Sequence, residues 1–159
     1  MDEIGAGADR TRALLGKEEV FQSSEALGEM LIRRFAAAVG SRNPAYWKQG
    51  APQDLAVPPT LIFELTYDIR GGIDLKTGLY EGLHRWAGSP KQLDRAGNDY
   101  RILRPAQADD VVTVRKKIVE VTEKQGKTGT WTFITTAITF TNQRNEVLGT
   151  DRETLACRY

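Results

Sequence analysis

The pattern of apolar and polar positions is most regular in the last third of the chain. Between residues 111 and 141, 17 of 31 residues are Val, Ile or Thr, the β-branched types that fit the pleated surface of a sheet. A turn at residues 125–127 divides this stretch into two strands, and a turn at residues 143–146 leads to another at residues 147–158. With a shorter strand expected at residues 99–103, the pattern predicts an antiparallel meander.

The N-terminal part of the chain has a helical pattern instead. A short strand is expected at residues 17–22, followed by an amphipathic helix of roughly four turns at residues 26–39. Ser23 and Ser24 are expected to cap the start of this helix, and Gly40 to end it. The apolar positions recur at intervals of four, at Leu27, Leu31, Phe35 and Val39.

A second helix is expected after Pro58 and Pro59, because proline is tolerated in the first turn of a helix. This helix is apolar on nearly every side, which predicts that it is buried, and Gly71 and Gly72 end it after about three turns. Glu64, which lies inside the apolar run, should face the less apolar side, near a subunit seam or an acyl tunnel. The side chains expected inside the sheet are Leu61, Ile62, Leu65 and Ile69.

The remaining segments are polar. Residues 41–56 and 73–97 predict irregular loops, the second with at most one short element, and residues 1–14 predict a flexible N-terminus. Residues 15–159 then form one domain with the order strand, helix, buried helix, long loop and antiparallel strands. This order predicts an α+β fold in which a long antiparallel sheet wraps around a buried central helix, the arrangement known as the hotdog fold.

Composition narrows the classes of function. Lys and Arg number 22 and Asp and Glu 21, a net charge of +1 that disfavours a dedicated nucleic-acid-binding protein. Cys157 is the one cysteine and His84 the one histidine, which excludes an internal disulfide framework and a paired-histidine zinc site. The longest uncharged run, at residues 128–143, is too short to span a bilayer, and the N-terminus has no apolar signal core. A cytoplasmic protein without a metal site is therefore expected.

Four motifs follow one another along the chain: residues 35–40 running into Asn43 and Pro44, Val-Pro-Pro-Thr at residues 57–60, Tyr-Arg-Ile-Leu-Arg-Pro at residues 100–105 followed by Asp109 and Asp110, and three long final strands. In this order and spacing they resemble the MaoC-like hydratases and dehydratases, particularly their N-terminal-type hotdog domain. The resemblance covers residues 15–158. It implies a hotdog fold, a coenzyme A thioester as the substrate, and no cofactor.

The family keeps its catalytic Asp and His in a loop of the form Gly-Asp-x-Asn-Pro-x-His. When Gly40 and Asn43 are aligned with that loop, Ser41 takes the position of the Asp and Tyr46 that of the His. A serine hydroxyl is no base at neutral pH, and a tyrosine with a pKa of about 10 is a poor one. The resemblance therefore implies a domain without the catalytic pair, similar to the non-catalytic partner of heteromeric enoyl-CoA hydratases.

Two other residues could supply acid and base chemistry. His84 could act as a general base, or it could be a loop histidine that only positions the substrate. Glu64 lies inside an apolar run and needs a partner or a purpose, and hotdog thioesterases often use a carboxylate at the start of this helix. Asp109 and Asp110 are expected in a turn, and Cys157 is expected as a buried, inert thiol.

The residues expected to bind the substrate are Asn43, Pro44, Trp47, His84, Trp86, Arg101 and Arg104. The arginines, with the basic residues at 115–117, could contact the phosphates of coenzyme A. The alternative for the basic residues is a solvated strand face with cross-strand charge pairs. The alternative for the tryptophans is packing in the core or at an interface.

The resemblance implies a tunnel-forming, non-catalytic subunit of a heteromeric enoyl-CoA hydratase or 3-hydroxyacyl thioester dehydratase, for bulky acyl groups such as steroid side chains. The partner is then a catalytic MaoC-like chain in a heterodimer or heterotetramer, or a second copy in a homodimer, because an exposed sheet edge needs cover. Two alternatives stay open. The chain could be a self-sufficient hotdog thioesterase or hydratase with a relocated acid and base, or a non-catalytic acyl-CoA-binding protein.

Overall fold

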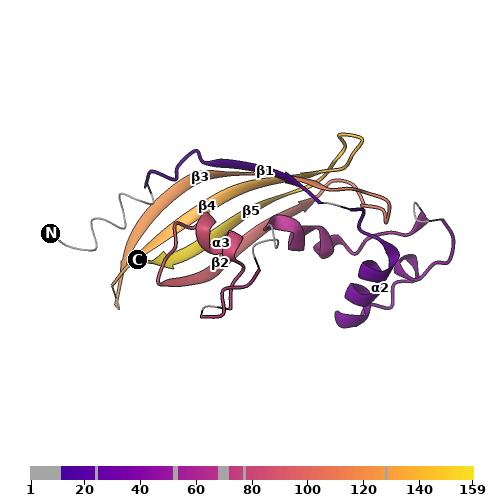
Figure 1. Ribbon diagram of the computed structural model, residues 1–159, viewed down its shortest axis with the longest axis horizontal. Coiled ribbons are helices and arrows are strands. Elements are labelled where there is room, and N and C mark those ends of the chain that lie inside the picture. The colour runs from indigo at the N-terminus through magenta and orange to yellow at the C-terminus, as the bar shows by residue number, and fades with distance from the viewer. Residues whose placement is uncertain (1–11, 24, 52–53, 68–71, 77, 128) are drawn as a thin grey trace.

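One curved antiparallel sheet forms the body of the protein. The computed structural model describes residues 12–23, 25–51, 54–67, 72–76, 78–127 and 129–159, and within these five strands pair in the order β1-β3-β4-β5-β2. The strands are β1 (Glu18–Gln22), β2 (Gln92–Ile102), β3 (Thr113–Gly126), β4 (Gly129–Thr141) and β5 (Val147–Arg158). In Figure 1 α3 (Glu81–Trp86) lies against one face of the sheet and α2 (Glu29–Ala38) lies beyond one end. The predicted α+β architecture and its final meander are confirmed.

The predicted start of α2 is wrong. The helix begins at Glu29 after Gly28, which has a φ of +72°, and not at residue 26 after a serine cap. The backbone N–H of Gly28 donates to the carbonyl oxygen of Ala108 at 2.9 Å, so the preceding chain is held extended against the loop before β3. Ser23 instead accepts a hydrogen bond from the backbone N–H of Val112 at 3.0 Å, and Ser24 lies outside the described residues.

The predicted end of α2 is confirmed. Gly40 has a φ of +67°, a conformation that glycine adopts without the steric cost of a Cβ. Its backbone N–H donates to the carbonyl oxygen of Ala37 at 3.0 Å, and that of Ser41 donates to Ala36 at 2.8 Å. This pattern closes the last turn of the helix and directs the chain into the loop that follows.

The predicted central helix is shorter than expected and of another type. Residues Pro59–Thr66 form a 3-10 helix, η3, and the chain is extended again at Tyr67. The prolines before and at its start carry no N–H donor, and Thr66 Oγ1 donates to the carbonyl oxygen of Phe63 at 2.7 Å. Such helices have poorer hydrogen-bond geometry than α-helices, which keeps them short.

The faces of η3 agree in part with the sequence prediction. Leu61, Ile62 and Phe63 are buried and Glu64 is exposed, as a buried carboxylate would require a partner. Leu65 is only half-buried, because the tighter turn of a 3-10 helix rotates it off the inner stripe. Ile69 and Gly71 lie outside the described residues.

The loop predicted at residues 73–97 is wrong at its C-terminal end. It contains one short helix, α3, which the sequence allowed, but β2 already begins at Gln92 rather than at residue 99. Along β2 only Leu93 and Asn98 are even half-buried, since this edge strand has one neighbour and both its faces are largely solvated. The alternating apolar signal of a strand is therefore missing, and a bulge between Arg95 and Gly97 interrupts it further.

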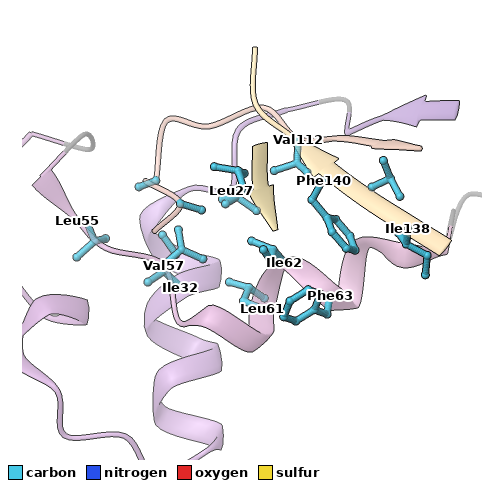
Figure 2. Packing of buried hydrophobic residues seen from close by; sticks show 14 residues of the cluster. Leu27, Ile32, Leu55, Val57, Leu61, Ile62, Phe63, Val112, Ile138 and Phe140 are labelled. Carbon is cyan, nitrogen blue, oxygen red and sulfur yellow. The ribbon is translucent and has the colours of Figure 1, made fainter. Parts of the chain in front are cut away.

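Two hydrophobic clusters lie on the inner face of the sheet. Figure 2 shows the first cluster, in which side chains of η3 and α2 gather with Val112, Ile138 and Phe140, and Phe63 meets Phe140 edge to face at 5.3 Å. The second cluster joins α3 to the far ends of the strands; its buried members are Tyr67, Leu83, Trp86, Ala87, Ile118, Ile134, Leu155 and Cys157. η3 and α3 therefore each cover part of the inner face, where the sequence predicted one buried helix of about three turns.

The burial difference along η3 predicts a difference in stability between two matched variants. Leu61→Ala should lower the free energy of unfolding by roughly 2–5 kcal/mol, because it leaves a cavity in the first cluster. Leu65→Ala, at a half-buried position of the same helix, should lower the free energy of unfolding by clearly less. Urea denaturation of both variants measures the difference, and an equal loss in the two would contradict this packing.

Candidate functional site

The loop after α2 has a fixed shape set by its own polar groups. The backbone N–H of Asn43 donates to Ser41 Oγ at 3.4 Å, and the side chain of Asn43 accepts from the backbone N–H of Ala45 at 3.0 Å. This second bond caps the short 3-10 helix η1 (Pro44–Tyr46). The indole Nε1 of Trp47 donates to the carbonyl oxygen of Ser41 at 3.3 Å. Ser41 and Asn43 therefore act as scaffold groups of the loop.

A pocket of about 220 Å³ opens between this loop, η3 and the end of β2. Most of its wall is apolar or formed by small side chains. Its polar side chains come from Asn43, Tyr46 and Arg104, and Ile62 and Ile102 form part of the apolar wall. None of the residues that line it is an Asp, Glu, Lys, Cys or His. The pocket has the composition of a binding site, and it lacks a group with the pKa of a general base at neutral pH.

Arg104 is held in place by a network of charged side chains. Its Nη1 lies 2.6 Å from Glu146 Oε1, and Glu146 Oε2 accepts from Asn142 Nδ2 at 2.8 Å. Hydrogen bonds from Asn142 and Arg144 lower the pKa of Glu146, and the charge of Arg104 adds to this effect, so the carboxylate stays ionised beside Arg104. Arg101, by contrast, is exposed on β2 with Asp99 at 3.6 Å, away from the pocket wall.

The other residues predicted for the site do not line this pocket. His84 lies on α3 with Nε2 at 2.9 Å from the carbonyl oxygen of Pro90. Trp86 is 1% exposed, and its Nε1 donates to Thr136 Oγ1 at 3.0 Å, which favours the core-packing alternative. Glu64 faces outward from η3, and Trp47 is partly exposed at the surface. Asn43, Tyr46 and Arg104 come together in the pocket, whereas Ser41, Pro44 and Trp47 of the same loop do not line it. The helix α3 contributes to the second cluster.

Sequence reasoning missed a buried cation on the inner face of the sheet. Lys116 is 1% exposed; its Nζ lies 2.9 Å from Glu19 and 4.3 and 4.6 Å from the ring centroids of Trp86 and Tyr67. Burial lowers the pKa of this lysine, and the hydrogen bond to Glu19 opposes that shift. The expected solvated strand face is therefore wrong for Lys116, while Arg115 next to it is exposed and pairs with Glu18.

Two buried carboxylates of β5 face the same side. Glu153 accepts a hydrogen bond from the hydroxyl group of Tyr67 and pairs with Arg95 Nε at 3.0 Å. Asp151 accepts from Asn98 Nδ2 at 2.8 Å through Oδ2. Burial raises the pKa of both carboxyl groups, that of Asp151 to about 6.

The sequence does contain a signal for the buried charged row formed by Lys116, Asp151 and Glu153. Charged residues occupy inward positions of otherwise alternating strands: Lys116 stands between Val114 and Ile118, and Asp151 and Glu153 precede Leu155 at the same spacing. Charge at such a position needs a partner or a function. The partners come from distant segments, so the sequence alone did not identify them.

The remaining candidates have structural roles. Asp110 is fully buried and accepts from the backbone N–H of Gln107 at 2.9 Å and from Arg144 Nη2 at 2.6 Å, which confirms a turn role. Burial raises the pKa of the Cys157 thiol to about 12, as expected for an inert group.

Among the described residues no cluster of three or more His, Cys, Asp or Glu side chains could hold a metal ion. None of the described helices is long and apolar enough to cross a membrane.

The raised pKa of Asp151 predicts a pH-dependent stability. Because the folded state favours the protonated form, the free energy of unfolding should fall as the pH rises from about 4 to about 6, by about 3 kcal/mol. Asp151→Asn should remove this fall, so the variant gains stability relative to the wild type between pH 4 and pH 7.5. Urea midpoints at the two pH values test this, with Asp99→Asn as an exposed control. If the urea midpoints of the wild type and Asp151→Asn changed equally between the two pH values, the raised pKa of Asp151 would be contradicted.

Comparison with known sequences assigns the family. Residues 14–150 match the family described as "FAS1-like, dehydratase domain region". A UPF0336 protein of Streptomyces coelicolor is 27% identical over 122 residues, which cover 72% of this chain and 75% of that protein. The family match therefore covers the loop after α2, the pocket and all of β3, and it ends at residue 150, before Asp151 and Glu153 of β5.

Solved structures agree with the fold. The chain is similar to one in the ChsH1-ChsH2 complex from Mycobacterium tuberculosis, with a TM-score of 0.71, 17% identity, and coverage of 98% of this chain and 91% of that one. It is also similar to one in the HadBC (3R-hydroxyacyl-ACP dehydratase) complex from the same organism, with a TM-score of 0.62, 20% identity, and coverage of 90% and 96%. The predicted hotdog fold is confirmed, and the chain belongs to the family described as "FAS1-like, dehydratase domain region".

Proposed function

We propose that this chain is the non-catalytic, tunnel-forming subunit of a heteromeric, cytoplasmic enoyl-CoA hydratase or 3-hydroxyacyl thioester dehydratase. The observation that carries the proposal is the pocket beside the loop after α2. Its scaffold is intact, with Asn43 capping η1 and Ser41 holding the loop, yet no carboxylate or imidazole lines it. This combination supports binding of an acyl thioester without turnover by this chain alone.

The chemistry explains why a second chain is needed. Addition of water across the double bond of an enoyl thioester requires a base that takes a proton from water and an acid that protonates the acyl chain. Ser41 is engaged with the backbone N–H of Asn43, and a serine hydroxyl has no basic character at neutral pH. Tyr46 lines the pocket, but a phenol hydroxyl is a poor base at neutral pH. A catalytic MaoC-like partner would supply the missing pair.

The edge strand β2 supports a place for that partner. It is an 11-residue strand with β5 on one side and no neighbour on the other within the described residues. Ile102 and Leu103, at and just after its end, are 50% and 63% exposed. An exposed strand edge with apolar side chains is a template for pairing with another chain. The similar ChsH1-ChsH2 and HadBC structures are themselves complexes of two different chains.

The roles of the pocket residues follow from their positions. Arg104, anchored by Glu146 at the pocket, would contact the phosphates of a coenzyme A thioester. Asn43 and Tyr46 would offer polar groups to the thioester end of the substrate. η3 ends at Thr66, and this short helix would leave more room for a bulky acyl group, such as a steroid side chain, than a longer helix in the same place.

The alternatives have weaker support. A relocated base at His84 would act from α3, where Nε2 already contacts the carbonyl oxygen of Pro90 and Leu83 and Trp86 belong to the second cluster. A thioesterase acid at Glu64 would act from the solvent side of η3. A pure acyl-CoA-binding protein would share the pocket and differ only in having no catalytic partner.

Activity of the isolated chain separates these functions. The purified chain should not hydrate crotonyl-CoA or a longer enoyl-CoA measurably, because the pocket lacks an acid and a base. Ser41→Asp combined with Tyr46→His should introduce slight activity, measured as loss of enoyl absorbance, with each single variant as the control. Robust turnover by the wild-type chain would exclude the non-catalytic role, and its loss in Glu64→Gln or His84→Gln would identify the relocated group.

A second prediction concerns association at β2. Leu103→Glu should weaken binding of the partner, or of a second copy, by tenfold or more, because a charge would be buried at the edge. Leu15→Glu, at an apolar residue that is 57% exposed beside the opposite sheet edge, is the matched control. Analytical ultracentrifugation at micromolar concentration, alone and with a co-purified partner, measures the effect. Equal association of both variants would rule out β2 as the interface.

A further inference from the structure

The inner face of the sheet continues from the pocket to a carboxylate that the pocket itself does not use. The pocket wall includes Ile102 of β2 and Ile62 of η3. Ile102 pairs with Gly149 of β5, and the next pair on the same face is Tyr100 with Asp151. Two residues of strand span about 7 Å, so Asp151 lies one row of side chains beyond the pocket wall.

Asp151 has one hydrogen-bond acceptor left without a partner. The residue is 4% exposed, and Oδ2 accepts from Asn98, whereas Oδ1 is buried with no hydrogen bond among the described residues. The nearest cation, Arg95, is paired with Glu153 at 3.0 Å. A buried acceptor without a donor is costly, so a working state of the protein is expected to supply one.

Tyr100 separates this acceptor from the pocket. Its ring stacks on Phe63 of η3 with the centroids 4.1 Å apart, yet the residue is 42% exposed because it stands on the edge strand. If Tyr100 turned outward, it would lose its stacking on Phe63 and open the face between the pocket and Asp151. An acyl chain that runs along β2 from the pocket would then pass beneath Tyr100 and meet Asp151.

We propose that Asp151 accepts a hydrogen bond from a hydroxyl group on the acyl chain of the substrate, beyond the part held in the pocket. The inference rests on the proposed function, since it requires an acyl thioester in this pocket. A hydroxyl supplies the missing donor at little desolvation cost. A carboxylate would be repelled by Asp151 and Glu153, and a plain alkyl end would leave Oδ1 unpaired.

Calorimetric titration of the full chain, in the assembly in which it purifies, tests the proposal with decanoyl-CoA and ω-hydroxydecanoyl-CoA. The hydroxylated ligand should bind about tenfold more tightly, as expected for a hydrogen bond to a charged acceptor. Asp151→Leu should abolish this preference, and Asp151→Asn, which keeps the side-chain shape, should reduce it. Asp99→Asn is the control, and an ω-carboxy ligand should bind more weakly than decanoyl-CoA.

The outcomes distinguish this proposal from the one on which it rests. Equal binding of the two ligands by the wild type overturns the role of Asp151 and leaves acyl-thioester binding intact. Equal weakening of both ligands in Asp151→Asn means that the residue only supports the fold, which also overturns it. If neither ligand binds the wild type, acyl-thioester binding by this pocket is wrong, and the role of Asp151 fails with it.

Discussion

The close approach of β2 and η3 to β5 at Gly149 is the constraint on which the site depends. A Cβ built on Gly149 would lie 2.9 Å from the carbonyl oxygen of Arg101 and 3.5 Å from Ile62 Cδ1. The missing side chain therefore lets the edge strand pair tightly and lets Ile62 settle on the sheet. Both walls of the pocket, Ile62 and Ile102, meet at this point. Any larger residue there would push apart the elements that form the pocket.

The charged row beyond Gly149 shows a conflict between stability and a polar inner face. Lys116 and Glu153 are buried with good partners, so removing one partner would leave an uncompensated charge. Asp151 is not fully satisfied even in the intact fold. An apolar side chain at the same position would pack between Ile138 and Tyr100 without this cost. The carboxylate of Asp151 is therefore better explained by the binding role proposed for it than by a role in stability.

How much of this could be predicted from the sequence depended on how local the signal was. The strands from residue 111 onward and the end of α2 at Gly40 carry local signals, β-branched residues and a glycine, and both predictions are confirmed. The start of α2 depends on hydrogen bonds to Ala108 and Asp110, some 80 residues away in sequence. The polar edge strand β2 lacks an alternating apolar pattern, so the sequence did not predict its start. The 3-10 form of η3 accompanies prolines that lack an N–H donor and a hydrogen bond from Thr66 Oγ1 to the carbonyl oxygen of Phe63. Tyr46 and Arg104 both line the pocket although they lie far apart in the sequence, so the sequence alone could not show that they share a site.

The loop after α2 is held in shape by its own polar groups. The hydroxyl of Ser41, which the resemblance aligns with the family's Asp, accepts from the backbone N–H of Asn43, and the carbonyl oxygen of Ser41 accepts from Trp47 Nε1. A carboxylate could make the same first contact, because both groups are acceptors. Under the proposed function, the serine keeps the loop in place without supplying a proton-transfer group. The pocket beside the loop would then serve binding, and turnover would depend on the partner chain.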